Sequence, residues 1–88
     1  MFTVYVLQSD STGKFYVGQT RNLERRFFEH RQGLARYTRG RGPWHLSYKE
    51  EHHTRAAVMQ RERFLKSGQG REWLRSHLGG RAGPPQAD

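Results

Sequence analysis

The chain has 88 residues, the size of one domain, and a domain this small buries only about 60 to 68% of the surface that its unfolded form exposes. It contains no cysteine, which excludes disulfides and thiolate metal sites. No run of apolar residues approaches the roughly 20 that span a bilayer, and the N-terminus lacks the pattern of a secretory signal. We therefore expect a cytoplasmic protein.

The composition is strongly basic. Sixteen Lys and Arg residues against eight Asp and Glu give a net charge of +8, and thirteen of the sixteen cations are Arg. The planar guanidinium of arginine binds phosphate oxygens in pairs, whereas lysine acts as a point charge. The charge therefore favours a polyanionic partner, DNA or RNA, over the plainer alternative of a small protein that is basic without binding nucleic acid.

The first part of the sequence predicts a β-hairpin followed by a helix. Residues 2–7 and 15–17 are rich in β-branched, aromatic and aliphatic side chains, and turn-forming residues separate them. Asn22 is an N-cap candidate for a helix over residues 22–32, in which apolar side chains recur near helical spacing. Gly33 is the natural stop of this helix.

The second part predicts a loop, a strand and two helices. Residues 33–43 hold three glycines, one proline and three arginines without an acidic residue, which is typical of a flexible cationic loop. Residues 44–49 alternate large and small side chains as a third strand does. Further helices are expected over residues 55–67, capped by Thr54 and closed by Gly68, and over residues 70–78. Residues 79–88, rich in Gly and Pro, are expected to form a flexible C-terminal tail on a domain of residues 1–78.

Two helices carry residues that suit phosphodiester hydrolysis, which needs a base for the attacking water, positive charge near phosphorus and usually a carboxylate-bound metal. Arg26 and His30 are four residues apart and share one helix face. The alternative is that Arg26 pairs with Glu29 on a solvated face while His30 fills a boundary position. Glu62, beside the apolar side of the second helix, is a metal-ligand candidate. The alternative is a plain ion pair with Lys66.

Tyr5 and Tyr16 lie on the two strands of the predicted hairpin and meet on one face if the register allows it. A phenol in water keeps its proton up to about pH 10, so either tyrosine acts as a base only beside a metal ion or another cation. The alternative is that the two tyrosines pack as core partners across the strands. The five histidines invite a zinc site, but their spacings match no ligand pattern.

Together these residues resemble a stand-alone GIY-YIG endonuclease domain over residues 1–78, nearly the whole chain. The resemblance rests on several short segments: Val4-Tyr5, Tyr16-Val17-Gly18, residues 19–26 (QTRNLERR), His30, residues 35–40 (ARYTRG) with Pro43-Trp44 after them, and Glu62 with Lys66. The similarity is closest to the small single-domain bacterial members. Homing and restriction enzymes of the family carry added DNA-recognition domains.

The resemblance implies an α+β fold, a small three-stranded antiparallel sheet flanked by helices, with a metal-dependent nuclease centre on one face. It implies that Tyr5 and Tyr16 line this centre and that one of them activates water, without fixing which. Arg26 would hold the scissile phosphate, and His30 would assist proton transfer or orient a tyrosine. Glu62 would bind a single Mg²⁺ or Mn²⁺.

Two positions depart from the family pattern. Thr3 stands where the first tripeptide of the family has its glycine, and residues 70–78 lack the asparagine that many members place late in the domain. Both departures concern the efficiency of catalysis and leave the implied fold unchanged.

The leading interpretation is a DNA endonuclease that selects structure rather than sequence, possessing no specificity domain and acting in repair or recombination on branched or single-stranded DNA. The loop residues Arg36, Arg39 and Arg41 would grip the backbone, Tyr37 would stack on an unpaired base, and Lys66 would add a further cation. Two alternatives remain, a non-catalytic DNA- or RNA-binding module and a subunit whose basic face meets an acidic protein. A carboxylate among the cations favours the enzyme.

Overall fold

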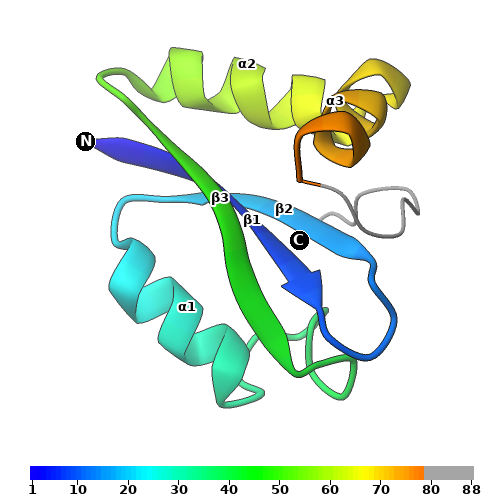
Figure 1. The fold of residues 1–88 in the computed structure, drawn as a ribbon. Coiled ribbons are helices and arrows are strands. Elements are labelled where there is room, and N and C mark those ends of the chain that lie inside the picture. Colours follow the sequence, from blue (N-terminus) through cyan, green and yellow to red (C-terminus); the bar gives the residue numbers. More distant parts are fainter. Residues whose placement is uncertain (79–88) are drawn as a thin grey trace.

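The computed structural model describes residues 1–78, and the predicted tail, residues 79–88, lies outside the described residues. The elements are, in chain order, β1 (Phe2–Ser9), β2 (Phe15–Thr20), α1 (Leu23–Arg31), β3 (Trp44–His52), α2 (Arg55–Lys66) and α3 (Gly68–Leu78). The three strands form one antiparallel sheet in the order β2-β1-β3, so β1 is the central strand (Figure 1). The predicted α+β fold is confirmed. Within residues 1–78 no helix has the length and apolar character that a membrane crossing requires.

The local signals explain most element boundaries. The Asn22 side chain accepts a hydrogen bond from the Arg25 N–H and caps α1, and the Thr54 side chain does the same for α2 through Ala57. Gly33 follows α1 with a φ of +74°, a left-handed conformation that glycine adopts without strain. β3 runs to His52, three residues beyond the predicted end.

The prediction that Gly68 closes the second helix is wrong. α2 ends at Lys66, Ser67 adopts an extended backbone with ψ of 172°, and Gly68 begins α3 two residues earlier than expected. The Ser67 hydroxyl accepts a hydrogen bond from the Gly70 N–H, so Ser67 satisfies the first turn of α3. The glycine therefore lies at a sharp helix–helix junction.

The sheet divides the core into two clusters because successive side chains of a strand point to opposite faces. One face packs against α2 and α3, and the other packs against α1 and residues 33–43. Figure 1 shows these helices on either side of the sheet. The first cluster consists of Val4, Val6, Phe15, Val17, Val58, Leu65 and Leu74. The second consists of Tyr5, Leu7, Tyr16 and Trp44, with Leu23, Phe27, Tyr37 and Leu46 packed around it.

A polar unit joins β3 to α2. The Arg61 Nε lies 3.1 and 3.0 Å from the two carboxylate oxygens of Glu50, and the Arg61 guanidinium lies over the Trp73 ring at 5.1 Å. The Tyr48 hydroxyl and the His52 Nε2, at 2.9 Å, also bond to Glu50. Burial raises the pKa of Glu50, but the hydrogen bonds from Tyr48, Arg61 and His52 outweigh it and hold the pKa below its ordinary value. This contact explains why an arginine occupies the apolar side of α2.

The contacts of Glu50 with Tyr48, Arg61 and His52 should make the protein less stable at acid pH. Because folding lowers the pKa of Glu50, its contribution is complete above the unfolded value of 4.5 and is lost as pH falls through the lower folded value. Thermal melting of the wild type and of Glu50→Gln should therefore differ most near neutral pH, and the difference should shrink as pH falls below 4.5. A gap in melting temperature that stays constant over this range would contradict the assignment.

Candidate active site

The two motif tyrosines lie on the same face of the sheet. In the β1–β2 register Tyr5 is opposite Gly18 and Tyr16 is opposite Leu7, so both tyrosines point toward the face that α1 covers. Both side chains are fully buried, and their ring centroids are 6.2 Å apart. The tyrosines therefore meet as predicted, and they also pack in the core as the alternative proposed.

His30 joins the tyrosines from the last turn of α1. Leu23, Phe27 and His30 recur at helical spacing, and the packing of the two apolar residues on the sheet turns His30 inward. The imidazole is 2% exposed and contacts the rings of Tyr5 and Tyr16 at centroid distances of 5.7 and 4.9 Å. Its Nε2 lies 2.9 Å from the Tyr5 Oη. His30 is thus a buried member of the cluster rather than a boundary residue.

Gly18 leaves the space that the Tyr5 hydroxyl occupies. A Cβ at residue 18 would lie 2.6 Å from the Tyr5 Oη and 2.8 Å from its Cζ. These separations are shorter than van der Waals contact, so any larger residue displaces the Tyr5 ring. The glycine of the second tripeptide therefore serves the site by its lack of a side chain.

Gly18→Ala should move Tyr5 away from His30 and lower the free energy of unfolding by about 1 to 3 kcal/mol, the usual cost of overpacking. Part of that loss should disappear in the Tyr5→Phe background, where the nearest clashing atom is gone. Denaturant unfolding of the two single variants and the double variant measures the coupling, which we expect to exceed about 0.5 kcal/mol. Additive losses would show that the residue 18 side chain meets something other than the Tyr5 hydroxyl.

The loop of residues 33–43 is anchored to the site by buried residues and hydrogen bonds. Ala35 and Thr38 are buried, and the Thr38 backbone oxygen accepts hydrogen bonds from the Trp44 Nε1–H and the Arg41 N–H. The far end of the loop is held by the Ser9 hydroxyl, which donates to the Arg41 carbonyl. These hydrogen bonds define the path of the chain between α1 and β3, and the flexibility of the loop stays a prediction.

Sequence reasoning did not single out Thr38 as a site residue. Its Oγ1 lies 2.7 Å from the His30 Nδ1, and its side chain is 1% exposed. No periodic pattern in an arginine- and glycine-rich loop indicates which residue turns inward. The sequence signal that could have indicated Thr38 is the segment of residues 35–40 (ARYTRG), which resembles the family pattern as a whole without marking any single residue.

Arg26 lies on α1, one turn before His30. Its Nη1 is 3.1 Å from a Glu29 oxygen, so the predicted alternative pair is present, and the Arg26 side chain is 26% exposed. Hydrogen bonding to Arg26 is the main cause that lowers the pKa of Glu29, partly opposed by desolvation. Arg26 also lines an open hollow of about 290 Å³, and its lining residues are Thr20, Arg21, Asn22, Arg25, Arg26 and Glu29. The cation is therefore held in place beside a space open to solvent.

Glu62 and Lys66 lie on α2, against the other face of the sheet. Lys66 Nζ is 2.9 Å from a Glu62 oxygen, so the alternative ion pair exists here as well. The buried Val58 and Leu65 mark the inward side of α2, and since Arg61 reaches β3, Glu62 occupies the flank away from β3. The structure does not join Glu62 directly to the tyrosine cluster, and its role as a metal ligand stays a prediction. Lys66 likewise lies away from the arginine loop.

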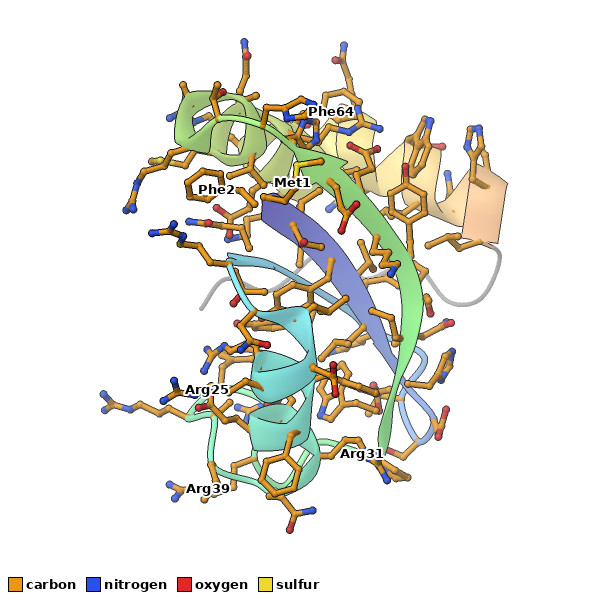
Figure 2. The ribbon with its side chains drawn as sticks, turned by 90° about the vertical axis from the view of Figure 1, so that its left-hand side faces the viewer. Met1, Phe2, Arg25, Arg31, Arg39 and Phe64 are labelled. Atoms are coloured by element: carbon orange, nitrogen blue, oxygen red, sulfur yellow. The ribbon has the colours of Figure 1, made fainter. Side chains whose placement is uncertain are left out.

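The loop cations differ in their surroundings. Arg36 and Arg39 are exposed, and Figure 2 shows Arg25 and Arg39 projecting outward from α1 and the loop after it. Arg41 lies over the Tyr37 ring at 4.7 Å, and Tyr37 also stacks on Tyr16 with centroids 6.0 Å apart. Stacking of a nucleic-acid base on Tyr37 therefore requires Arg41 to move.

The carboxylates and histidines of residues 1–78 suit only a metal ion that needs few protein ligands. Within residues 1–78, no group of three or more His, Asp or Glu side chains is placed to hold a cation. Mg²⁺ keeps several waters and is often bound by one or two carboxylates plus substrate phosphates. A single carboxylate such as Glu62 therefore fits an ion that is completed by water and DNA.

Comparison with known proteins agrees with this fold. Residues 1–78 match the model of the GIY-YIG catalytic domain. A UPF0213 protein of Natronomonas pharaonis is 48% identical over 66 residues, which cover 73% of this chain and 75% of that protein. A UPF0213 protein of Clostridium perfringens is 41% identical over 64 residues, 72% of this chain and 68% of that protein. The solution NMR structure of a UPF0213 protein from Bacillus halodurans is 35% identical, with a TM-score of 0.54 and coverage of 90% of this chain and 87% of that one. The chain therefore belongs to the GIY-YIG family, as a relative of its small stand-alone UPF0213 members.

Proposed function

We propose that the protein is a metal-dependent endonuclease that hydrolyses DNA phosphodiester bonds. The observation that carries the proposal is the buried contact of the Tyr5 hydroxyl with His30 on the sheet face that α1 covers. A phenol and an imidazole at hydrogen-bonding distance form a pair in which the imidazole stabilises charge on the phenol oxygen. A protein that only binds nucleic acid has no need for such a pair in its core.

The residues divide the work of the reaction between them. One tyrosine oxygen takes the proton of the attacking water, and His30 stabilises or relays charge at that oxygen. The Arg26 guanidinium replaces its contact with Glu29 by one to the scissile phosphate and stabilises the charge that develops there. Glu62, which lies against the other face of the sheet, would hold Mg²⁺ or Mn²⁺ in place of the Lys66 ammonium, and such an ion supplies positive charge to a DNA phosphate that reaches it.

Substrate choice follows from the cationic surface. The exposed Arg36 and Arg39, with Arg41, offer contacts to backbone phosphates, which carry no sequence information. We therefore propose that the enzyme selects DNA structure, such as branched or single-stranded DNA, and that it acts in repair or recombination. Residence in the cytoplasm stays a prediction.

The second candidate is a nucleic-acid-binding module that keeps the fold without catalysis. The observation that favours it is the engagement of Arg26 and Glu62 in ion pairs with Glu29 and Lys66. If these pairs persist when DNA is bound, the chain retains its charge but has no free phosphate clamp or metal ligand.

Cleavage and binding assays separate the two candidates. Supercoiled, branched and single-stranded DNA are incubated with the wild type, with and without Mg²⁺ or Mn²⁺, and binding is measured in parallel. The nuclease predicts cuts that require the metal and are lost in Glu62→Ala but kept in Glu72→Ala, a carboxylate on exposed α3 surface. Tight, salt-sensitive binding without cuts would establish the module instead.

A further inference from the structure

A continuous chain of polar contacts links Tyr5 to Thr38. The Tyr5 Oη is 2.9 Å from the His30 Nε2, and the His30 Nδ1 is 2.7 Å from the Thr38 Oγ1. The three side chains come from β1, α1 and the loop of residues 33–43, and all are at most 2% exposed. Thr38 thus touches the imidazole from the side opposite to the tyrosine.

The backbone holds Thr38 in place independently of its hydroxyl. Its carbonyl accepts the Trp44 Nε1–H at 3.0 Å and the Arg41 N–H at 3.1 Å. Trp44 is itself buried against the ring of Tyr16, with centroids 6.3 Å apart. The hydroxyl is therefore presented to His30 by a fixed segment of chain.

The direction of the hydrogen bonds follows from the buried hydroxyl. A neutral imidazole has one N–H donor and one acceptor nitrogen. Within residues 1–78 the hydrogen-bond partner of the Thr38 Oγ1 is the His30 Nδ1. If Oγ1 accepted a hydrogen bond from Nδ1–H, its own hydrogen would be buried without an acceptor among residues 1–78, which is unfavourable. The favoured arrangement has Thr38 donating to Nδ1, so that the imidazole proton is on Nε2 and points to the Tyr5 oxygen.

We propose that Thr38 is a positioning residue that fixes the proton of neutral His30 on Nε2, so that His30 donates a hydrogen bond to the Tyr5 oxygen. The catalytic consequence rests on the proposed nuclease function. A donor at the Tyr5 Oη stabilises the phenolate form of Tyr5, which forms when the phenol loses its proton to solvent. The phenolate then takes one proton from the attacking water and becomes a phenol again. The resulting hydroxide forms a bond to phosphorus while the bond between phosphorus and the leaving DNA oxygen breaks, and that oxygen takes a proton from solvent. Of the two motif tyrosines, Tyr5 is then the base.

NMR of the imidazole nitrogens tests the proposal without any assay of activity. In ¹⁵N-labelled wild type at a pH where His30 is neutral, Nε2 should show the shift of a protonated nitrogen and Nδ1 that of an acceptor nitrogen. Thr38→Val keeps the size and removes the donor, so the Nδ1–H form should appear, whereas Thr38→Ser should keep the wild-type pattern. A proton on Nδ1 in the wild type would overturn the proposal, even if Thr38→Val does not fold.

Single-turnover DNA cleavage is the second test of the role of Thr38. Thr38→Val should cut about 10- to 100-fold more slowly, a loss of the size seen when the hydrogen-bond partner of a metal-bound histidine is removed. Thr38→Ser should recover most of the rate. Equal rates for wild type and Thr38→Val would overturn the role of Thr38. A wild type that never cuts refutes the nuclease function, and the NMR spectra still decide whether Thr38 sets the tautomer.

Discussion

Gly70→Ala should lower the free energy of unfolding by at least about 3 kcal/mol, the upper end of the usual cost of overpacking. A Cβ at residue 70 would collide with the backbone oxygen of Phe64 and would lie 2.5 Å from the Cα of Leu65. These are backbone atoms at the end of α2, so no change of rotamer relieves the clash. The only relief is to separate α3 from α2, which exposes the buried Leu65 and Leu74.

Thermal and denaturant unfolding measure this loss, which for a domain of this size corresponds to a fall in melting temperature of about 12 to 24 °C. Gly68→Ala is the matched control, because it is in the same helix and a Cβ there meets no atom within 4 Å. It should be neutral within about 0.5 kcal/mol or stabilising, since alanine favours helix. A similar loss in both variants would show that the contact with Phe64 and Leu65 is not the cause.

The same junction illustrates how far the sequence could be read. A glycine after a helical run is normally a C-cap, and that local rule predicted the end of the second helix at Gly68. The rule cannot detect that Ser67 breaks the helix and caps the next one, because that outcome depends on the close packing of Gly70 against Leu65. By contrast, the hairpin and α1 follow from signals within a few residues of each other. The helix was predicted to within one residue at each end, and both strands begin where they were predicted, although β1 runs two residues and β2 three residues beyond the predicted ends.

In the site, too, some residues could be predicted from the sequence and others could not. Tyr5, Tyr16 and His30 were identified through the motif pattern, and the register of β1 with β2 together with the apolar side of α1 brings them together. Thr38 and the Glu50 partner of Arg61 were not predicted, because each is defined by a contact with a separate element. Burial of a polar residue against a distant partner leaves no periodic signal in the sequence.

Arg26→Ala should slow DNA cleavage by about 100- to 1000-fold, the loss typical of removing one group that stabilises charge in the transition state. Arg26 is the half-buried cation on the helix that carries His30, and it borders the open hollow at the start of α1. A partly buried cation keeps more of its field than one in open solvent. Loss of the pair with Glu29 should cost little stability, because that pair is near the surface and such pairs contribute about 0.2 to 1 kcal/mol.

Arg25→Ala is the matched control for this loss. Arg25 is the neighbouring residue, also pairs with Glu29, at 3.4 Å, and its side chain is 77% exposed, pointing outward in Figure 2. Removing it changes the net charge by the same amount and should weaken DNA binding slightly, as the loss of one phosphate contact does. Any loss shared by the two variants therefore reflects what the two residues have in common, which is the charge, the pair with Glu29 and the hollow that both line.

The ratio of single-turnover cleavage rates of Arg25→Ala and Arg26→Ala, on the same supercoiled DNA with Mg²⁺, tests the nuclease assignment most directly. We predict that Arg25→Ala cuts at close to the wild-type rate and that Arg26→Ala is slower by at least about 100-fold. Equal rates for the two variants, or a wild type that binds this DNA and leaves it intact, would contradict the assignment.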